Sequence, residues 1–97
     1  MIQTSEELIY ADLDKALQRI GYTREDSAKE RVYRHPSDKD ARIRYPMLPL
    51  SDPVREYHRV AARQIVDGFG IVPAEDFDLL LLRLAHERRD MSVTTPN

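Results

Sequence analysis

Acid–base chemistry near neutral pH would depend on the three histidines of this chain, because it contains no cysteine. His35 ends a predicted strand directly before Pro36, and it is a candidate general acid or base or a phosphate contact. The alternative is that His35 only caps the turn after the strand. His58 is predicted to be a solvated residue of a basic helix face, and His86 a charge partner of a helix C-terminus. No two histidines lie four residues apart, so we expect no metal site and no cofactor.

Arginine is the second residue type that could form a functional site, since its guanidinium suits bidentate phosphate contacts. Residues 29–63 hold nine basic and five acidic side chains, a local balance of +4 in a chain whose net charge is −2. One interpretation is a surface that binds RNA, and the other is a solvated lattice of salt bridges with the acidic flanks. The candidate RNA-binding residues are Lys29, Arg31, Arg34, Arg42, Arg44, Arg59 and Arg63.

A helix must precede this basic segment. Thr4 and Glu7 have the spacing of a capping box, and Leu13, Leu17 and Ile20 follow at helical intervals. Gly21 comes directly after the last apolar residue, where a left-handed residue ends many helices. The pattern predicts a helix over residues 5–20.

Two strands are predicted to carry four of the six candidate arginines. Residues 30–35 have strand composition, 36–40 are turn formers, and 41–45 alternate between arginine and apolar residues. This alternation predicts that Arg42 and Arg44 share one face of the sheet. Residues 22–28 are predicted to form a further short strand or a loop.

Two helices are predicted to complete the fold. Ser51-Asp52-Pro53 is typical of a helix start, and a helix is expected over residues 53–68 with its inner face on Val54, Tyr57, Ala61 and Ile65. A further helix is expected over 73–89 with Phe77, Leu80, Leu81 and Leu84 in the core. The predicted fold is a single α+β domain over 1–89, with helices on one face of an antiparallel sheet and a flexible tail at 90–97.

The order of elements and several short motifs resemble the HicA-like toxins, small ribonucleases with a double-stranded-RNA-binding-domain-like fold. The matching stretches lie within residues 8–82 and are LDKALQRIGY at 13–22, VYRHP at 32–36, IRYP at 43–46, IVDGFGI at 65–71 and the acidic helix at 73–80. The resemblance implies RNA as substrate and an antitoxin as protein partner. It also implies a catalytic histidine in a Gly-Ser-His motif, but Ala28, Lys29 and Glu30 stand at the corresponding positions here.

Glu30 at this position is a candidate base. Cleavage through the RNA 2′-hydroxyl needs a base and an acid, and Glu30 with His35 would supply both types without a metal. Residues five apart on a strand point to opposite faces, so the two can act together only if a bulge intervenes. Tyr33 and Tyr45 are expected to fill the core, with stacking on bases as the alternative.

Two other functions remain open on the sequence alone. The chain is alternatively a non-enzymatic module that binds a protein partner, such as an antitoxin-like protein. The segment around Phe69 also allows a helix-turn-helix reader of DNA, although the following helix begins with acidic residues.

Glu6 and Glu7 exclude a signal peptide, and the longest apolar run, 79–82, is far shorter than the ~20 residues of a membrane span. We therefore expect a cytoplasmic protein.

Overall fold

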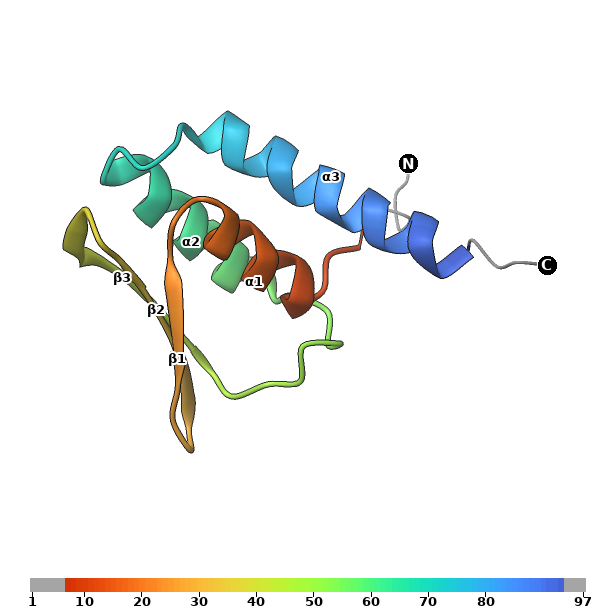
Figure 1. The fold of residues 1–97 in the computed structure, drawn as a ribbon, viewed down its shortest axis with the longest axis horizontal. Coiled ribbons are helices and arrows are strands. Elements are labelled where there is room, and N and C mark those ends of the chain that lie inside the picture. The colour runs from red at the N-terminus through yellow and green to blue at the C-terminus, as the bar shows by residue number, and fades with distance from the viewer. Residues whose placement is uncertain (1–6, 94–97) are drawn as a thin grey trace.

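The computed structural model of the protein describes the backbone of residues 7–93 and the side chains of residues 7–90. One helix, three strands and two further helices follow in order, as predicted, and confirm the α+β class (Figure 1). The elements are α1 (Tyr10–Arg19), β1 (Thr23–Asp26), β2 (Glu30–His35), β3 (Asp38–Pro46), α2 (Glu56–Gly68) and α3 (Ala74–Val93).

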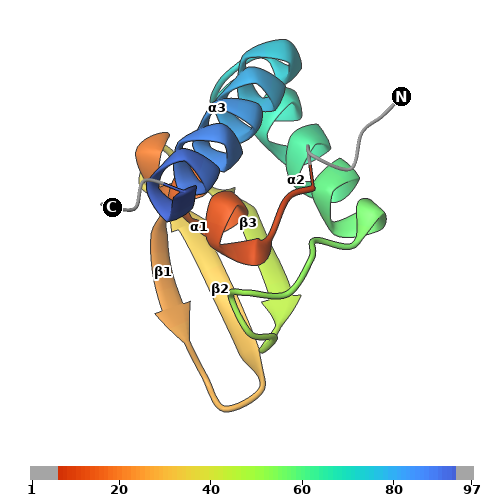
Figure 2. The ribbon, with the colours of Figure 1, turned by 90° about the vertical axis from the view of Figure 1, so that its right-hand side faces the viewer.

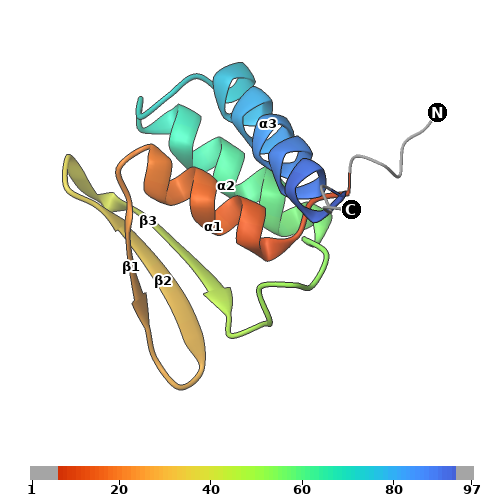
Figure 3. The same ribbon diagram turned by 45° about the vertical axis from the view of Figure 1, so that its right-hand side comes forward.

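The elements form three layers. The strands make an antiparallel sheet in the order β1-β2-β3. All three helices lie on one side of this sheet, with α1 and α2 next to the strands and α3 outermost (Figures 2 and 3). The opposite face of the sheet is therefore covered by no helix of the described chain.

The register of the sheet fixes which side chains reach each face. Val32 pairs with both Glu25 and Arg44, and Thr23 pairs with Arg34. Cross-strand partners point to the same side of a sheet, so these residues share the face without helices. We call this face the outer sheet face. The residues between them along β2 and β3 point toward α1 and α2.

The core fills the space between the sheet and the helices. Leu17 of α1 and Phe77 of α3 are completely buried, and Tyr33 of β2 and Tyr45 of β3 are 1% and 3% exposed. Tyr33 and Tyr45 therefore fill the core, as expected, and do not present their rings for stacking. Leu81 and Leu84 are buried and Leu80 is half-buried, which confirms the predicted inner face of the last helix.

Helix α1 begins later than the capping box at Thr4 predicts. Residues 7–9 are not helical, because Ile9 forms an antiparallel bridge with Pro53. The backbone N–H of Ile9 donates to the Asp12 carboxylate at 3.0 Å, so the N-terminal cap of α1 is at Ile9. Thr4 itself lies outside the described residues.

The inner face of α2 is also different from the prediction. The bridge to Ile9 keeps Pro53 extended, so the helix begins at Glu56 and not at residue 53. Its buried residues are His58, Ala62 and Val66, whereas Tyr57 is 62% exposed and Ala61 is exposed. The predicted face is therefore wrong by one residue, a rotation of about 100° around the helix axis.

Two further boundaries differ. Strand β3 begins at Asp38, and His35 pairs with Asp38, so the connection has two residues and not the predicted five at 36–40. Helix α3 continues to Val93, past the predicted end at 89. The last four residues of the predicted tail, 94–97, lie outside the described chain.

Candidate functional site

Glu30 and His35 occupy opposite ends of β2. At about 3.3 Å per residue, the strand separates them by roughly 16 Å. A register shift between Tyr33 and His35 is present, but it does not bring the two together. Glu30 lies 3.7 Å from Arg44 in an ion pair, on the outer sheet face. The structure thus does not combine the predicted base and acid in one site.

The His35 imidazole is held on both of its nitrogens. Its Nε2 lies 2.9 Å from the carbonyl oxygen of Ile20, and its Nδ1 accepts from the Ser37 N–H at 3.2 Å. The ring also packs edge-on against Tyr22. These contacts tie the hairpin turn to the end of α1, which is the turn-capping role given above as the alternative.

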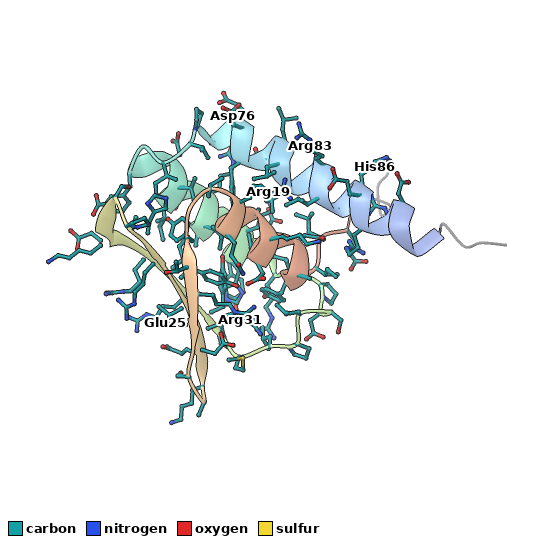
Figure 4. The ribbon with its side chains drawn as sticks, in the orientation of Figure 1. Arg19, Glu25, Arg31, Asp76, Arg83 and His86 are labelled. Atoms are coloured by element: carbon teal, nitrogen blue, oxygen red, sulfur yellow. The ribbon has the colours of Figure 1, made fainter. Side chains whose placement is uncertain are left out.

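Three of the predicted RNA-binding arginines gather on the outer sheet face. Arg34 pairs with Glu25 at 3.0 Å and Arg44 with Glu30, and all four side chains are substantially exposed. Figure 4 shows Glu25 on the side of the sheet away from the helices. Arg42 is exposed and makes no ion pair or side-chain hydrogen bond with any other described residue.

Arg31 belongs to the opposite face and is only 5% exposed. Its Nη2 donates to the carbonyl oxygen of Leu48 at 2.8 Å, while its buried Nε has no partner within the described chain (Figure 4). The prediction that Arg31 lies on an RNA-binding surface is therefore wrong. The physical reason is strand alternation: Arg31 is two residues from the core residue Tyr33 and shares its side of the sheet.

The helix arginines pair with α3. Arg63 Nε donates to Asp78 at 3.0 Å, and Arg59 lies 3.9 Å from the same carboxylate and also pairs with Glu56. Lys29 is exposed in the β1–β2 turn. Because α2 and the outer sheet face lie on different sides of the sheet, the seven predicted residues do not form one continuous surface.

His58 is, like Arg31, a side chain that was predicted to be exposed and is buried. It is 8% exposed and packs against Tyr45 and Tyr57, with ring centroids 4.9 and 4.5 Å away. The Tyr10 hydroxyl accepts from the Arg55 N–H at 3.2 Å and lies within hydrogen-bond distance of His58 Nδ1, at 2.6 Å. This network fits the neutral imidazole. The prediction of a solvated His58 is therefore wrong.

The pKa of His58 is lowered, first by burial and then by the charge of Arg55. Its Nε2 has no hydrogen bond within residues 7–93, and it is not among the fully buried atoms that lack a partner. Solvent therefore reaches Nε2. If Nδ1 accepts from the Tyr10 hydroxyl, the proton of the neutral ring lies on Nε2, which then donates to solvent and cannot accept a further proton.

Acid should destabilise the protein through His58. Its folded pKa lies below the unfolded value of about 6.5, so its stabilising contribution is complete above that pH and is lost as the pH falls through the folded pKa. We expect the urea midpoint to fall between pH 7.5 and pH 5. His58→Gln, which keeps a polar group but cannot titrate, should show a smaller fall. An equal fall in both proteins would contradict this assignment.

No group of three or more histidine, aspartate or glutamate side chains within the described residues is placed to hold a metal ion. No helix in the same part of the chain is long and apolar enough to cross a bilayer. Comparison of the chain with protein-family models, curated proteins and solved structures gave no match.

Proposed function

We propose that this chain is an RNA-binding protein of the HicA-like kind, and that it contacts RNA with the outer sheet face. The observation that carries the proposal is the exposed position of Arg34, Arg42 and Arg44 on a face that no helix of the described chain covers (Figure 2). Arg42 of this group makes no ion pair with any carboxylate of the described residues.

The ion pairs on this face do not oppose the proposal strongly. Arg34–Glu25 and Arg44–Glu30 are exposed, and exposed pairs contribute only about 0–1 kcal/mol. A phosphate can replace such a carboxylate at small cost, because the guanidinium keeps a charge-assisted hydrogen bond. The acidic neighbours keep the surface near electrical balance, so the binding is weak. Its affinity falls as salt rises, because each phosphate contact releases counterions from the RNA.

The proposal revises the set of RNA-binding residues. Arg34, Arg42 and Arg44 stay, together with Lys29 in the adjoining turn. Arg31 is buried and drops out. Arg59 and Arg63 are paired with Asp78 on the far side of the sheet. Toxin-like cleavage by Glu30 and His35 is not part of the proposal, because the two lie at opposite ends of β2.

Two double variants with the same charge change test this surface. Replacing Arg42 and Arg44 with alanine should weaken binding of a single-stranded RNA and flatten the plot of log affinity against log salt by about 1.4, or 0.7 per lost phosphate contact. Replacing Arg59 and Arg63 with alanine removes the same charge and should leave the slope near that of wild type. Fluorescence anisotropy at several salt concentrations measures both.

An equal loss of RNA affinity in the two double variants would mean that only the net charge of the protein matters. That result would contradict the outer sheet face as the binding site. Absence of RNA binding by wild type at low salt would remove the RNA proposal. Circular dichroism of each variant verifies the fold before binding is compared.

A second candidate is a non-enzymatic module that binds protein, such as an antitoxin-type partner. The observation in its favour is the exposure of Leu79 and Leu82 on α3, at 63% and 43%. Apolar side chains grouped on a surface are typical of protein contacts. Both candidates are consistent with a cytoplasmic location, which is part of the proposal.

A further inference from the structure

The outer side of α3 combines apolar side chains with charges of opposite sign. Leu79 and Leu82 are exposed. In the sequence they lie between Asp76, near the start of the helix, and Arg83, which is one turn after Leu79. Figure 4 shows Asp76 and Arg83 projecting from the side of α3 that faces away from α1 and α2. We call Asp76, Leu79, Leu80 and Arg83 the α3 outer face.

Neither charge on this face is used within the described chain. Asp76 and Arg83 make no ion pair or side-chain hydrogen bond with any residue in it, in contrast to Asp78 and Arg63 on the inner side. A shallow hollow of about 220 Å³ lies between them, lined by Asp76, Leu79, Leu80 and Arg83. The face thus offers an apolar depression with one free acid and one free base at its ends.

This pattern is complementary to itself. Asp76 and Arg83 are seven residues apart, and the midpoint between them falls between Leu79 and Leu80. When two copies of a helix run antiparallel across a two-fold axis at this midpoint, Asp76 of each copy faces Arg83 of the other. Leu79 of each copy then meets the hollow beside Leu80 of the other. We propose that two copies of this chain associate through their α3 outer faces in this antiparallel arrangement.

A second copy fits better than an unrelated partner because the match arises from one helix alone. A two-fold contact needs each surface to satisfy itself, and a partner of uniform charge would leave either Asp76 or Arg83 opposed by a like charge. Helix α3 forms the outermost layer over about 30 Å, so no other helix or strand of the described chain blocks the approach (Figure 1). The outer sheet face lies on the other side of the molecule, so this proposal is independent of RNA binding.

Sedimentation velocity across a wide range of protein concentration tests the association. A contact of one helix is smaller than a standard interface, so we expect a dissociation constant of about 10 µM to 1 mM. Asp76→Arg should weaken association by about tenfold or more, because the two-fold axis converts two attractive pairs into two repulsive ones. Arg83→Asp should do the same.

The double variant Asp76→Arg with Arg83→Asp restores opposite charges and should recover wild-type association. Asp40→Arg makes the same charge change at an exposed residue of β3 and should leave association unchanged. Leu79→Gln keeps a helix-compatible side chain and should weaken association without altering the charges. A wild type that stays monomeric at millimolar concentration would overturn the proposal, as would a double variant that fails to recover association.

Discussion

Replacing Leu17 with alanine should lower the free energy of unfolding by about 3 kcal/mol. Leu17 is completely buried in α1, the helix that lies between the sheet and α3. Truncation of such a leucine loses the free energy of transferring the removed carbons out of water, and it leaves a cavity that the neighbouring side chains fill only in part. Because domains are stable by about 5–15 kcal/mol, this single change would remove a large share of the total.

Urea unfolding followed by circular dichroism measures the effect, and Leu79→Ala is the matched control. Leu79 is 63% exposed, so the same truncation at this residue should change stability by less than about 0.5 kcal/mol. Both proteins should be compared at a concentration where wild type is monomeric. If the urea midpoint of Leu17→Ala equals that of Leu79→Ala, the Leu17 side chain does not contribute to the stability of the core.

Alanine at the three glycines should produce a graded series, with the largest loss at Gly21. Gly21 follows α1 with φ of 109°, and a Cβ there would lie 2.6 Å from His35 Nε2. The substitution strains the backbone and also displaces the imidazole from the Ile20 carbonyl, so we expect a loss of about 3 kcal/mol. Gly70 has φ of 71° and open space around it, so alanine there should cost only about 1 kcal/mol.

Gly68 is the internal control of this series. It is the last residue of α2, it has no neighbour within 4 Å of an added Cβ, and its φ is not positive. Alanine at this residue should stabilise the protein by up to about 1 kcal/mol, because alanine is the better helix former. Thermal unfolding of the three variants ranks them. Equal losses at Gly21 and Gly70 would mean that contact with His35 contributes nothing.

Local patterns predicted which residues of β3 are buried, although not where the strand begins. The alternation of arginine with Ala41, Ile43 and Tyr45 predicts the buried face of β3, and these three residues are buried as a consequence. Such alternation depends only on the two-residue period of a strand, so distant contacts cannot change it without breaking the sheet. The same period places Arg31 with Tyr33, and it is the signal that would have identified Arg31 as buried.

The start and the inner face of α2 were not predictable in this way. Pro53 after Ser51 and Asp52 is a good local helix start, but its bridge to Ile9 is a contact between distant segments, and it keeps Pro53 extended. The burial of His58 depends on the Tyr10 hydroxyl, another distant residue. Ala62 and Val66 follow His58 at intervals of four, so the correct face was visible as a second pattern, less apolar than the predicted one.

The antiparallel bridge between Ile9 and Pro53 has a consequence for the order of folding. Three backbone hydrogen bonds surround this bridge. The N–H of Tyr10 donates to the carbonyl oxygen of Asp52 at 3.0 Å, that of Ala11 to the carbonyl oxygen of Leu50 at 2.9 Å, and that of Val54 to the carbonyl oxygen of Leu8 at 2.9 Å. These bonds close a loop of about 40 residues, whose entropy cost is greater than that of the tight β2–β3 turn. We therefore expect the β2–β3 hairpin to form first and the bridge to form last. The hydrogen-exchange protection of these three amides then reports when the N-terminal segment has packed against the sheet.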